Sequence, residues 1–437
     1  MSINYRTNLY QLPESISNED HVVIKVILKS ESHDCIKLAG EMAAEQSFGS
    51  WVELPGVTEK LIEKHGAKVI NAFSVPDYTD KLPDGQRYIF VELAYPTINF
   101  GYQLPMMFTS VAGIIGMMLL KVVDVKFPQP FLDSLPGPKF GIEGLRKYLN
   151  VWDRPLLLSM VKPCVGLSPN ETAQLFYEVT SGGFDLIKDD EKIADTSYSS
   201  IADRVKAVMK KAKQVYDQTG LHKYYAVNIT DKPDKLLENA YAAKDAGANM
   251  LMINVLSAGL GALQMVAESD VNLPILGHPD GVGAVSWSKS RGWSAHLMLG
   301  KFPRLCGSDI IGYGSSYSKI MHTQESSMRV ALSMVAAIKG KKATFPMPAG
   351  AVHAGSIKPL MDDLGDDLVL GAGGGVYGHP MGAHAGAKSV YQALVAVKEN
   401  RDLVDAAKEY KELAAAIDKW GICGDDTKTE GLLELKK

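Results

Sequence analysis

Eight short apolar runs, spread over the last two thirds of the chain, constrain its fold more than any other feature. A stretch of helical pattern follows each run, and successive runs begin 24 to 39 residues apart. The runs are Pro155–Pro163, Asp185–Glu191, Tyr224–Thr230, Met250–Leu256, Pro274–Pro279, Asp309–Gly314, Ala343–Gly350 and Leu368–Gly375. Eight such strand–helix units predict a (β/α)8 barrel. A doubly wound open sheet is the rival, but it typically has fewer strands, and no GxGxxG fingerprint opens the first helix.

The residues before these runs predict a separate domain. Strands are expected at 21–30, 67–75 and 87–93, a helix at 32–46, and a buried apolar helix at 104–120. These elements indicate an α+β domain of the ferredoxin-like kind over residues 1–135. The turn-rich segment 134–138 marks its end, so the barrel is expected to span residues 136–437. Two domains also suit a length of 437 residues, which exceeds what one compact core usually spans.

Composition and charge exclude several classes of function. A net charge of −4 with no basic block gives no electrostatic footprint for nucleic acid. The apolar segment 104–120 contains Pro105, Gly113 and Gly116 and is slightly short for a membrane span, which favours a buried helix. The four cysteines lie far apart without zinc spacing, and the N-terminus lacks the apolar core of a signal peptide. We therefore expect a cytoplasmic protein that binds neither membranes nor nucleic acid.

Polar residues recur where the predicted barrel strands end. Catalytic groups of such barrels lie at the carboxyl ends of the strands, whereas the interior prefers branched apolar side chains. The polar and glycine positions at these ends are Lys162, Lys188, Asp190, Glu191, Asn228, Asn254, His278 and Gly373–Gly375. Their recurrence predicts an active site at this end of the barrel, in which Asn228 is expected to contact the substrate.

The segment GGFDLIKDDE, residues 182–191, carries the strongest chemical signal. On a strand, Lys188 and Asp190 share one face, and Glu191 can turn inward as the strand ends. Asp190 and Glu191 supply the hard oxygen ligands that suit Mg²⁺. If Lys188 lost its proton and reacted with CO₂, the resulting carbamate would supply a third oxygen. A solvated charge cluster at a strand end is the alternative reading of the same residues.

This segment resembles the signature of the RuBisCO superfamily, and the likeness extends over nearly the whole chain. The resemblance implies that Lys188 is carbamylated and that Asp190 and Glu191 bind Mg²⁺. It also implies that Lys162, in the segment KPCVGLS, takes part in proton transfer. In the segment GGGVYGHP it assigns phosphate binding to Gly373 and Gly374.

The same resemblance assigns roles to residues elsewhere in the chain. His278 occupies the position of an active-site histidine, and Lys319 falls by simple counting on a lysine that steadies a carboxylate. The segment AEQSFGSW, residues 44–51, resembles a part of the N-terminal domain that completes the active site of a partner subunit. Glu45, Ser50 and Trp51 are therefore expected to reach a neighbouring barrel in a homodimer with shared active sites.

Five positions depart from the pattern of the carboxylating enzymes. Cys164 replaces a lysine, Pro279 a phosphate-binding arginine, and Gly312 a histidine. Met106 and Ala349 stand where those enzymes hold an asparagine and a substrate-binding serine. The metal site is intact, whereas the groups that CO₂ addition requires are altered. We therefore expect a RuBisCO-like protein that enolises a small phosphorylated substrate but does not fix CO₂.

Further segments of the chain are SLPGPKFGIEGLRKYL, RPLLLSMVK, LIKDDE, YYAVNIT, LGHPDGVGA and AIDKWG. Among the RuBisCO-like proteins, they resemble the 2,3-diketo-5-methylthiopentyl-1-phosphate enolases of methionine salvage. Those enzymes use a lysine just after the apolar helix as the base, and counting places Met118 or Leu119 there, with Lys121 the nearest lysine. Lys162 is the alternative base. One alternative is a decarboxylase, transcarboxylase or hydrolase of a phosphorylated keto acid such as 3-oxo-isoapionate 4-phosphate, which Lys319 would suit. Another phosphosugar isomerase and a non-catalytic regulatory protein are further alternatives.

Overall fold

The computed structural model describes residues 9–50, 52, 54–75, 82–113, 120–317 and 323–423. The chain divides into two compact units, Met1–Leu135 with Gly281–Met298 and Pro136–Asp280 with Leu299–Lys437. The first is called the N-terminal unit below, and the second the barrel unit. The assignment of the segment Gly281–Met298 to the N-terminal unit differs from the expectation of an uninterrupted barrel from residue 136 onward.

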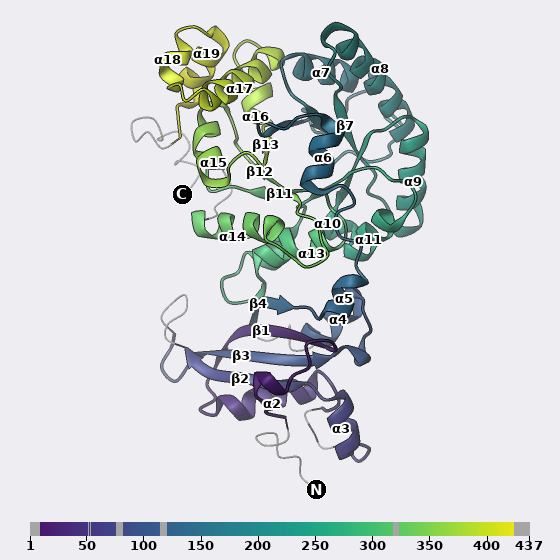
Figure 1. The fold of residues 1–437 in the computed structure, drawn as a ribbon, viewed down its shortest axis with the longest axis vertical. Coiled ribbons are helices and arrows are strands. Elements are labelled where there is room, and N and C mark those ends of the chain that lie inside the picture. The colour runs from purple at the N-terminus through teal and green to yellow at the C-terminus, as the bar shows by residue number, and fades with distance from the viewer. Residues whose placement is uncertain are drawn as a thin grey trace. The chain divides into compact units, whose positions relative to one another are not determined.

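The N-terminal unit is built on a five-stranded mixed sheet with the strand order β10-β4-β1-β3-β2. Its strands are β1 (His21–Ser30), β2 (Lys68–Val75), β3 (Arg87–Pro96), β4 (Leu120–Lys126) and β10 (Gly292–Trp293). Its helices are α2 (Cys35–Glu45), α3 (Glu59–His65) and α4 (Leu104–Ala112). Strands β1 to β4 pair antiparallel and alternate with helices in the β-α-β-β-α-β order of a ferredoxin-like domain (Figure 1). The predicted fold class of this domain is confirmed.

The apolar segment 104–120 does not form one helix as predicted. Helix α4 ends at Ala112, where Gly113 follows, and strand β4 begins at Leu120. Strand β4 then carries the short parallel strand β10 at its side. Lys121 on β4 is buried, and its Nζ donates to the carbonyl oxygens of Ser286 at 2.8 Å and Ser288 at 2.5 Å. These bonds attach the segment Gly281–Met298 to the sheet.

The barrel unit contains a closed barrel of eight parallel strands in the order β11-β12-β13-β5-β6-β7-β8-β9. The strands are β5 (Leu156–Met160), β6 (Leu186–Lys188), β7 (Tyr224–Asn228), β8 (Met250–Asn254), β9 (Ile275–His278), β11 (Ile310–Gly314), β12 (Phe345–Ala349) and β13 (Val369–Gly371). Each lies within one of the eight predicted runs, so the predicted (β/α)8 barrel is confirmed.

Helices surround this barrel (Figure 1). Those that follow the strands include α7 (Pro169–Ser181), α8 (Ile201–Thr219), α9 (Pro233–Asp245), α11 (Leu260–Glu268), α14 (Gln324–Val335), α15 (Ile357–Leu364) and α17 (Ala383–Lys398). Between β9 and β11, the segment Gly281–Met298 belongs to the N-terminal unit, and the short helix α13 (Phe302–Leu305) belongs to the barrel unit. Among the described residues, no helix combines the length and the hydropathy that crossing a membrane would require.

Alternate residues of the strands fill the barrel. The buried interior cluster includes Leu156 and Leu158 of β5, Leu186 of β6, Tyr224 and Ala226 of β7, Met250 and Met252 of β8, Leu276 of β9, Ile310 of β11, Phe345 and Met347 of β12, and Val369 of β13. Leu145 and Leu149 of helix α6 (Gly141–Leu149) join this cluster. Since side chains of a strand alternate between its two faces, the next inward position is two residues further along each strand.

Asp309, directly before β11, ties three segments together inside the barrel unit. Its buried carboxylate accepts hydrogen bonds from the N–H groups of Phe140 and Gly141, at 2.8 Å each, and of Ile275 at 3.0 Å. The start of α6 and the start of β9 are therefore held to the strand that follows Asp309.

We predict that Asp309→Ala lowers the free energy of unfolding of the barrel by about 3 kcal/mol, because three buried N–H donors lose their acceptor. Differential scanning calorimetry would measure the loss as a lower melting temperature. Asp217→Ala is the matched control, because that exposed carboxylate only pairs with Lys213 one helical turn away and should change little. Equal melting temperatures for the two variants would contradict this role of Asp309.

Candidate active site

Four polar side chains occupy the inward positions at the carboxyl ends of β6 to β9. Lys188, Asn228, Asn254 and His278 each lie two residues beyond an inward core residue of the same strand, such as Leu186 before Lys188. The two-residue period of the strands therefore directs all four into the mouth of the barrel. Adjacent strands place Asn254 opposite His278 in register.

Lys188 is the most deeply buried cation of the mouth, with 1% of its surface exposed. Its Nζ donates to the main-chain carbonyl of Asp189 at 2.9 Å. Burial lowers the pKa of Lys188 to about 8, although the negative charges of Glu191 and Asp190 oppose the shift. This amine is thus much closer to its neutral form at physiological pH than an ordinary lysine is.

Asp190 and Glu191 are surrounded by lysines. Lys162, which follows β5, donates to Asp190 Oδ2, and its Nζ lies 3.1 Å from the Cys164 sulfur. Lys192 Nζ lies 3.3 Å from Asp190 Oδ1 and 2.7 Å from Glu191 Oε1. Burial would raise the pKa of Asp190, but the hydrogen bonds from Lys162 and Cys164 and the positive charge of Lys162 together outweigh burial and lower that pKa. The two carboxylates are therefore ionised and available as ligands for a cation.

Two carboxamides hold the loop that carries Glu191. Asn254 Nδ2 donates to the Glu191 carbonyl at 3.0 Å, and Asn228 Nδ2 donates to the Ile193 carbonyl at 2.9 Å. Asn228 Oδ1 accepts from the Thr230 N–H at 3.1 Å, so this side chain is used to shape the loop. Its expected contact with the substrate stays a prediction. Asn254 Oδ1, in contrast, is buried and has no partner among the described residues.

His278 is also incompletely bonded. Its Nε2 lies 3.6 Å from Glu191 Oε2, while its Nδ1 is buried and has no partner within the described part of the chain. Burial, and secondly the positive charge of Lys188, lower the pKa of His278 to about 3. A neutral imidazole with one open nitrogen in a polar mouth can accept a hydrogen bond from a substrate.

The candidate metal ligands at this site are two carboxylates, to which water or a substrate oxygen could add. Over the described residues, no group of three His, Cys, Asp or Glu side chains is placed to hold a metal. Asp190 and Glu191 provide two oxygen donors of the kind that Mg²⁺ prefers. Lys188 lies near these two carboxylates as well, and its amine interacts with both of them.

The glycine segment after β13 lies beside β5. A Cβ atom on Gly373 would come within 2.3 Å of the Met160 sulfur, so a larger residue here would require the Met160 side chain to move. Helix α16 (Gly374–Tyr377) starts directly after it, and the first N–H groups of a helix have no partner within the helix. The arrangement is compatible with the phosphate site predicted at Gly373 and Gly374, and phosphate binding there stays a prediction.

The opposite side of the mouth is apolar. Gly312 on β11 pairs with Met347 on β12, and a Cβ atom at Gly312 would lie 2.9 Å from Met347 Cε and 3.0 Å from Pro279 Cδ. Ala349 ends β12. Strands β11 and β12 contain no charged residue. The mouth is therefore divided into a polar half on β6 to β9 and a small, apolar half on β11 and β12.

The remaining predicted residues lie elsewhere. Glu45 ends α2 and Ser50 follows it, both in the N-terminal unit, and exposed Met106 lies on α4 of that unit. Trp51, Met118, Leu119 and Lys319 fall outside the described residues. Lys192 was not predicted, although its position directly after KDDE in the sequence could have indicated an ion pair.

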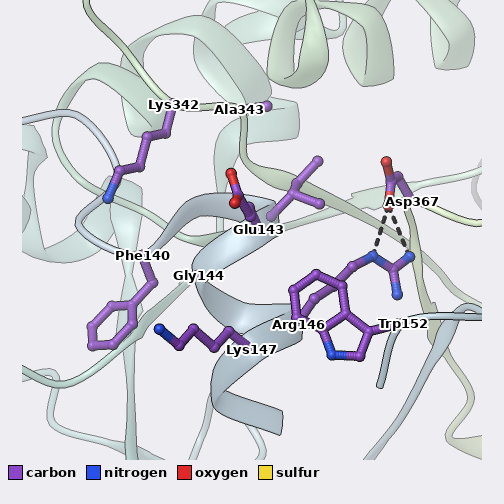
Figure 2. Close-up of a pocket in the computed structure, with 10 residues that line it drawn as sticks. Phe140, Glu143, Gly144, Arg146, Lys147, Trp152, Lys342, Ala343 and Asp367 are labelled. Atoms are coloured by element: carbon purple, nitrogen blue, oxygen red, sulfur yellow. Dashed lines mark hydrogen bonds and ion pairs between the residues drawn. The ribbon is translucent and has the colours of Figure 1, made fainter. Parts of the chain in front are cut away.

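A cleft of about 670 Å³ lies at the other end of the barrel (Figure 2). Its lining comes from α6 and from residues just before β5, β12 and β13, such as Trp152, Ala343 and Asp367. Figure 2 shows Arg146 bonded to Asp367, a contact that satisfies both charges. In barrels of this type the amino ends of the strands serve stability rather than chemistry. This cleft is therefore not a candidate active site.

Two family descriptions match the chain. The catalytic domain of the ribulose bisphosphate carboxylase (RuBisCO) large chain matches residues 141–420, and its N-terminal domain matches residues 10–131. A ribulose bisphosphate carboxylase-like protein of Archaeoglobus fulgidus is 38% identical over 414 residues, covering 93% of this chain and 95% of that protein. The 2,3-diketo-5-methylthiopentyl-1-phosphate enolase of Geobacillus thermodenitrificans is 33% identical over 407 residues, covering 91% and 98%.

The chain is also similar to solved structures of RuBisCO and RuBisCO-like proteins. The rubisco-like protein (MtnW) of Alicyclobacillus acidocaldarius superposes with a TM-score of 0.85 at 33% identity, covering 92% of this chain and all of that chain. The octameric RuBisCO of Pyrococcus horikoshii has a TM-score of 0.86 at 30% identity, covering 95% and 97%. The dimeric RuBisCO of Hyperthermus butylicus has a TM-score of 0.84 at 30% identity, covering 96% and 100%.

We predict that His278 stays neutral from about pH 8 to about pH 5 in the metal-free protein, whereas an ordinary histidine would gain a proton in this range. NMR of protein labelled with 15N-histidine measures the protonation state, and His278→Gln identifies the signal. Lys188→Met should raise the pKa of His278, since it removes a neighbouring positive charge. An imidazolium at His278 at pH 6 would show that the mouth is not desolvated as described.

Proposed function

The chain belongs to the RuBisCO large-chain family, and from that premise we propose that it is a RuBisCO-like enolase acting on a phosphorylated diketone without fixing CO₂. The observation that carries the proposal is the convergence of Lys188, Asp190, Glu191 and His278 at the mouth of the barrel. The relatives named as enolases support the reaction class. The proposed substrate is 2,3-diketo-5-methylthiopentyl 1-phosphate.

We infer that the site binds Mg²⁺ through Asp190, Glu191 and a carbamate on Lys188. Asp190 and Glu191 supply two carboxylate ligands, and the buried Lys188 amine, whose pKa is lowered, interacts with both. Addition of the neutral amine to CO₂, with loss of one proton, converts a repelling cation into an anionic oxygen donor. When bound there, Mg²⁺ would act as a Lewis acid that polarises the carbonyl oxygens of the substrate.

Two further side chains near this position, Lys162 and His278, have separate roles in the proposed enolisation. Lys162 stands beside Asp190 as a fixed positive charge, since its hydrogen bonds to Asp190 and Cys164 and the charge of Asp190 together outweigh burial and raise its pKa. Such a cation stabilises negative charge that develops on an oxygen during enolisation. His278 Nδ1 is buried and open, so the neutral imidazole can accept a hydrogen bond from a hydroxyl or enol group of the substrate.

The named enolases use a lysine as the base, and counting finds no lysine at that position of this chain. The lysine expected after the apolar helix counts to Met118 or Leu119, and Lys121 donates to two carbonyl groups of its own unit. With Lys121 occupied in this way, proton removal by a group of the barrel mouth is the better proposal.

The apolar half of the mouth supports the choice of substrate. Gly312, Met347 and Pro279 fill one side with carbon and sulfur atoms, so a second phosphate would meet no charged partner on β11 or β12. A substrate with one phosphate and an apolar methylthio tail suits this division. The phosphate would bind at Gly373 and Gly374, and a homodimer would bring Glu45 and Ser50 of a partner to the mouth.

The keto-acid decarboxylase alternative depends on Lys319, which lies outside the described residues. The names of the relatives favour the enolase over that alternative and over a regulatory protein. Release of CO₂ from a phosphorylated keto acid remains the signal that would distinguish the two reactions.

We predict rapid enol formation when 2,3-diketo-5-methylthiopentyl 1-phosphate is added in D₂O with Mg²⁺ and bicarbonate, followed by NMR. Lys188→Ala should lower the rate by roughly 100-fold or more, because it removes the proposed third metal ligand. Lys213→Ala, an exposed change on α8, is the control and should keep the wild-type rate. Removal of Mg²⁺ with a chelator should have the same effect as the loss of Lys188.

The absence of both an enol product and deuterium uptake in the wild-type protein would refute the enolase proposal. Phosphorylated keto acids would then be tested for CO₂ release. A Lys188→Ala variant as active as the wild type would instead retain the enolase and remove the carbamate from its mechanism.

A further inference from the structure

The second residue of the KDDE segment faces away from the mouth. Asp189 is fully buried on the outer face of the barrel, and its neighbours in the sequence, Lys188 and Asp190, face inward. Arg204, near the start of α8, is also fully buried and lies against it. A buried carboxylate directly between two active-site residues can therefore influence both of them.

The Asp189 carboxylate is held by three partners. Arg204 donates to Asp189 Oδ2 through Nη2 at 3.0 Å and Nε at 3.2 Å. Tyr225, on the outer face of β7, donates its hydroxyl hydrogen to Asp189 Oδ1. The N–H of Asn228 donates to Asp189 Oδ2 at 2.9 Å, which ties the end of β6 to the end of β7.

Arg204 is itself fixed on every side. Its Nη1 donates to the Ser199 carbonyl at 2.6 Å, and its Nε also lies 3.1 Å from the Tyr225 hydroxyl. A planar guanidinium with this many bonds leaves its partner little freedom to rotate. Rotation of Asp189 about the strand axis would turn Lys188 and Asp190 out of the mouth, since all three share one short segment.

The main chain of Asp189 transmits this restraint directly. Its carbonyl oxygen accepts the hydrogen bond from Lys188 Nζ at 2.9 Å, and its N–H donates to the Ala226 carbonyl at 3.0 Å. The amine of Lys188 thus points where the Asp189 peptide directs it. The same peptide leads into Asp190, so one anchored residue sets two of the proposed metal ligands.

We propose that Asp189, Arg204 and Tyr225 form a positioning network that orients Lys188 and Asp190 for binding of the metal ion. This inference rests on the proposed function, and it assigns these three residues no contact with substrate or metal. Partners behind metal ligands commonly change metal affinity when they are altered, which gives the network a measurable effect.

Tyr225→Phe tests the network with the smallest change. The matched control is Tyr224→Phe, because the Tyr224 hydroxyl donates to the Tyr148 carbonyl at 2.5 Å, inside the barrel and away from KDDE. Tyr225→Phe removes the hydrogen bonds that the hydroxyl makes with Asp189 and Arg204, and Tyr224→Phe removes the one to Tyr148. In bicarbonate buffer without substrate, calorimetric titration with Mg²⁺ should show roughly ten-fold weaker binding for Tyr225→Phe and wild-type affinity for Tyr224→Phe.

Arg204→Lys provides a stronger change with its own control. Arg304 is another buried arginine of the barrel unit, whose guanidinium donates to the carbonyls of Lys342 at 2.9 Å and Ala336 at 2.7 Å. Arg204→Lys should lower Mg²⁺ affinity and kcat with little change in KM, whereas Arg304→Lys should lower only the melting temperature. If Arg204→Lys does not fold, the Mg²⁺ affinity of Tyr225→Phe relative to Tyr224→Phe is the test of the proposal.

The proposal is overturned if Tyr225→Phe and Tyr224→Phe bind Mg²⁺ equally well while melting at similarly reduced temperatures. The network would then serve stability alone. The outcome is separable from the proposed function, because Mg²⁺ affinity is measured without substrate. A wild-type protein that binds Mg²⁺ but enolises no diketone would refute the enolase and leave the positioning test valid.

Discussion

The alternation of side chains at the end of strand β6 is the constraint on which the site depends. Leu186 and Lys188 face into the barrel, and Asp189 faces outward onto Arg204. A buried carboxylate without a partner would be destabilising. The ion pair with Arg204 therefore keeps Asp189 on the outer face of the barrel. Because the strand period is two, that one assignment places both Lys188 and Asp190 at the mouth.

The barrel mouth combines two environments that differ in chemistry. On β6 to β9, lysine, carboxylate, carboxamide and imidazole groups converge, and burial brings the Lys188 amine toward neutrality. Strands β11 and β12, which carry Gly312 and Met347, contain no charged residue. Enolisation needs the first environment, because negative charge develops on oxygen. The second environment disfavours another anionic group, which agrees with a reaction that ends before CO₂ is added.

Much of the fold was predictable because buried parallel strands form apolar runs, and all eight barrel strands lie within the predicted runs. The sequence did not reveal β10, a strand of two residues that pairs far from its position in the chain. The predicted helix 104–120 was longer than α4, which ends at Ala112, because apolar residues continue in the sequence up to β4. KDDE was recognisable by its composition, whereas the role of Asn228 in the loop and the partner of Asp189 depend on contacts between distant segments.

The central claim is that Lys188, Asp190 and Glu191 together hold a metal ion once Lys188 has reacted with CO₂. A high-resolution crystal structure of the protein grown with Mg²⁺ and bicarbonate tests it most directly. The account predicts a carbamate on Lys188 Nζ and one Mg²⁺ bound by that carbamate and by both carboxylates. An unmodified Lys188 still bonded to the Asp189 carbonyl, with Lys162 on Asp190 and no ion between them, would contradict it.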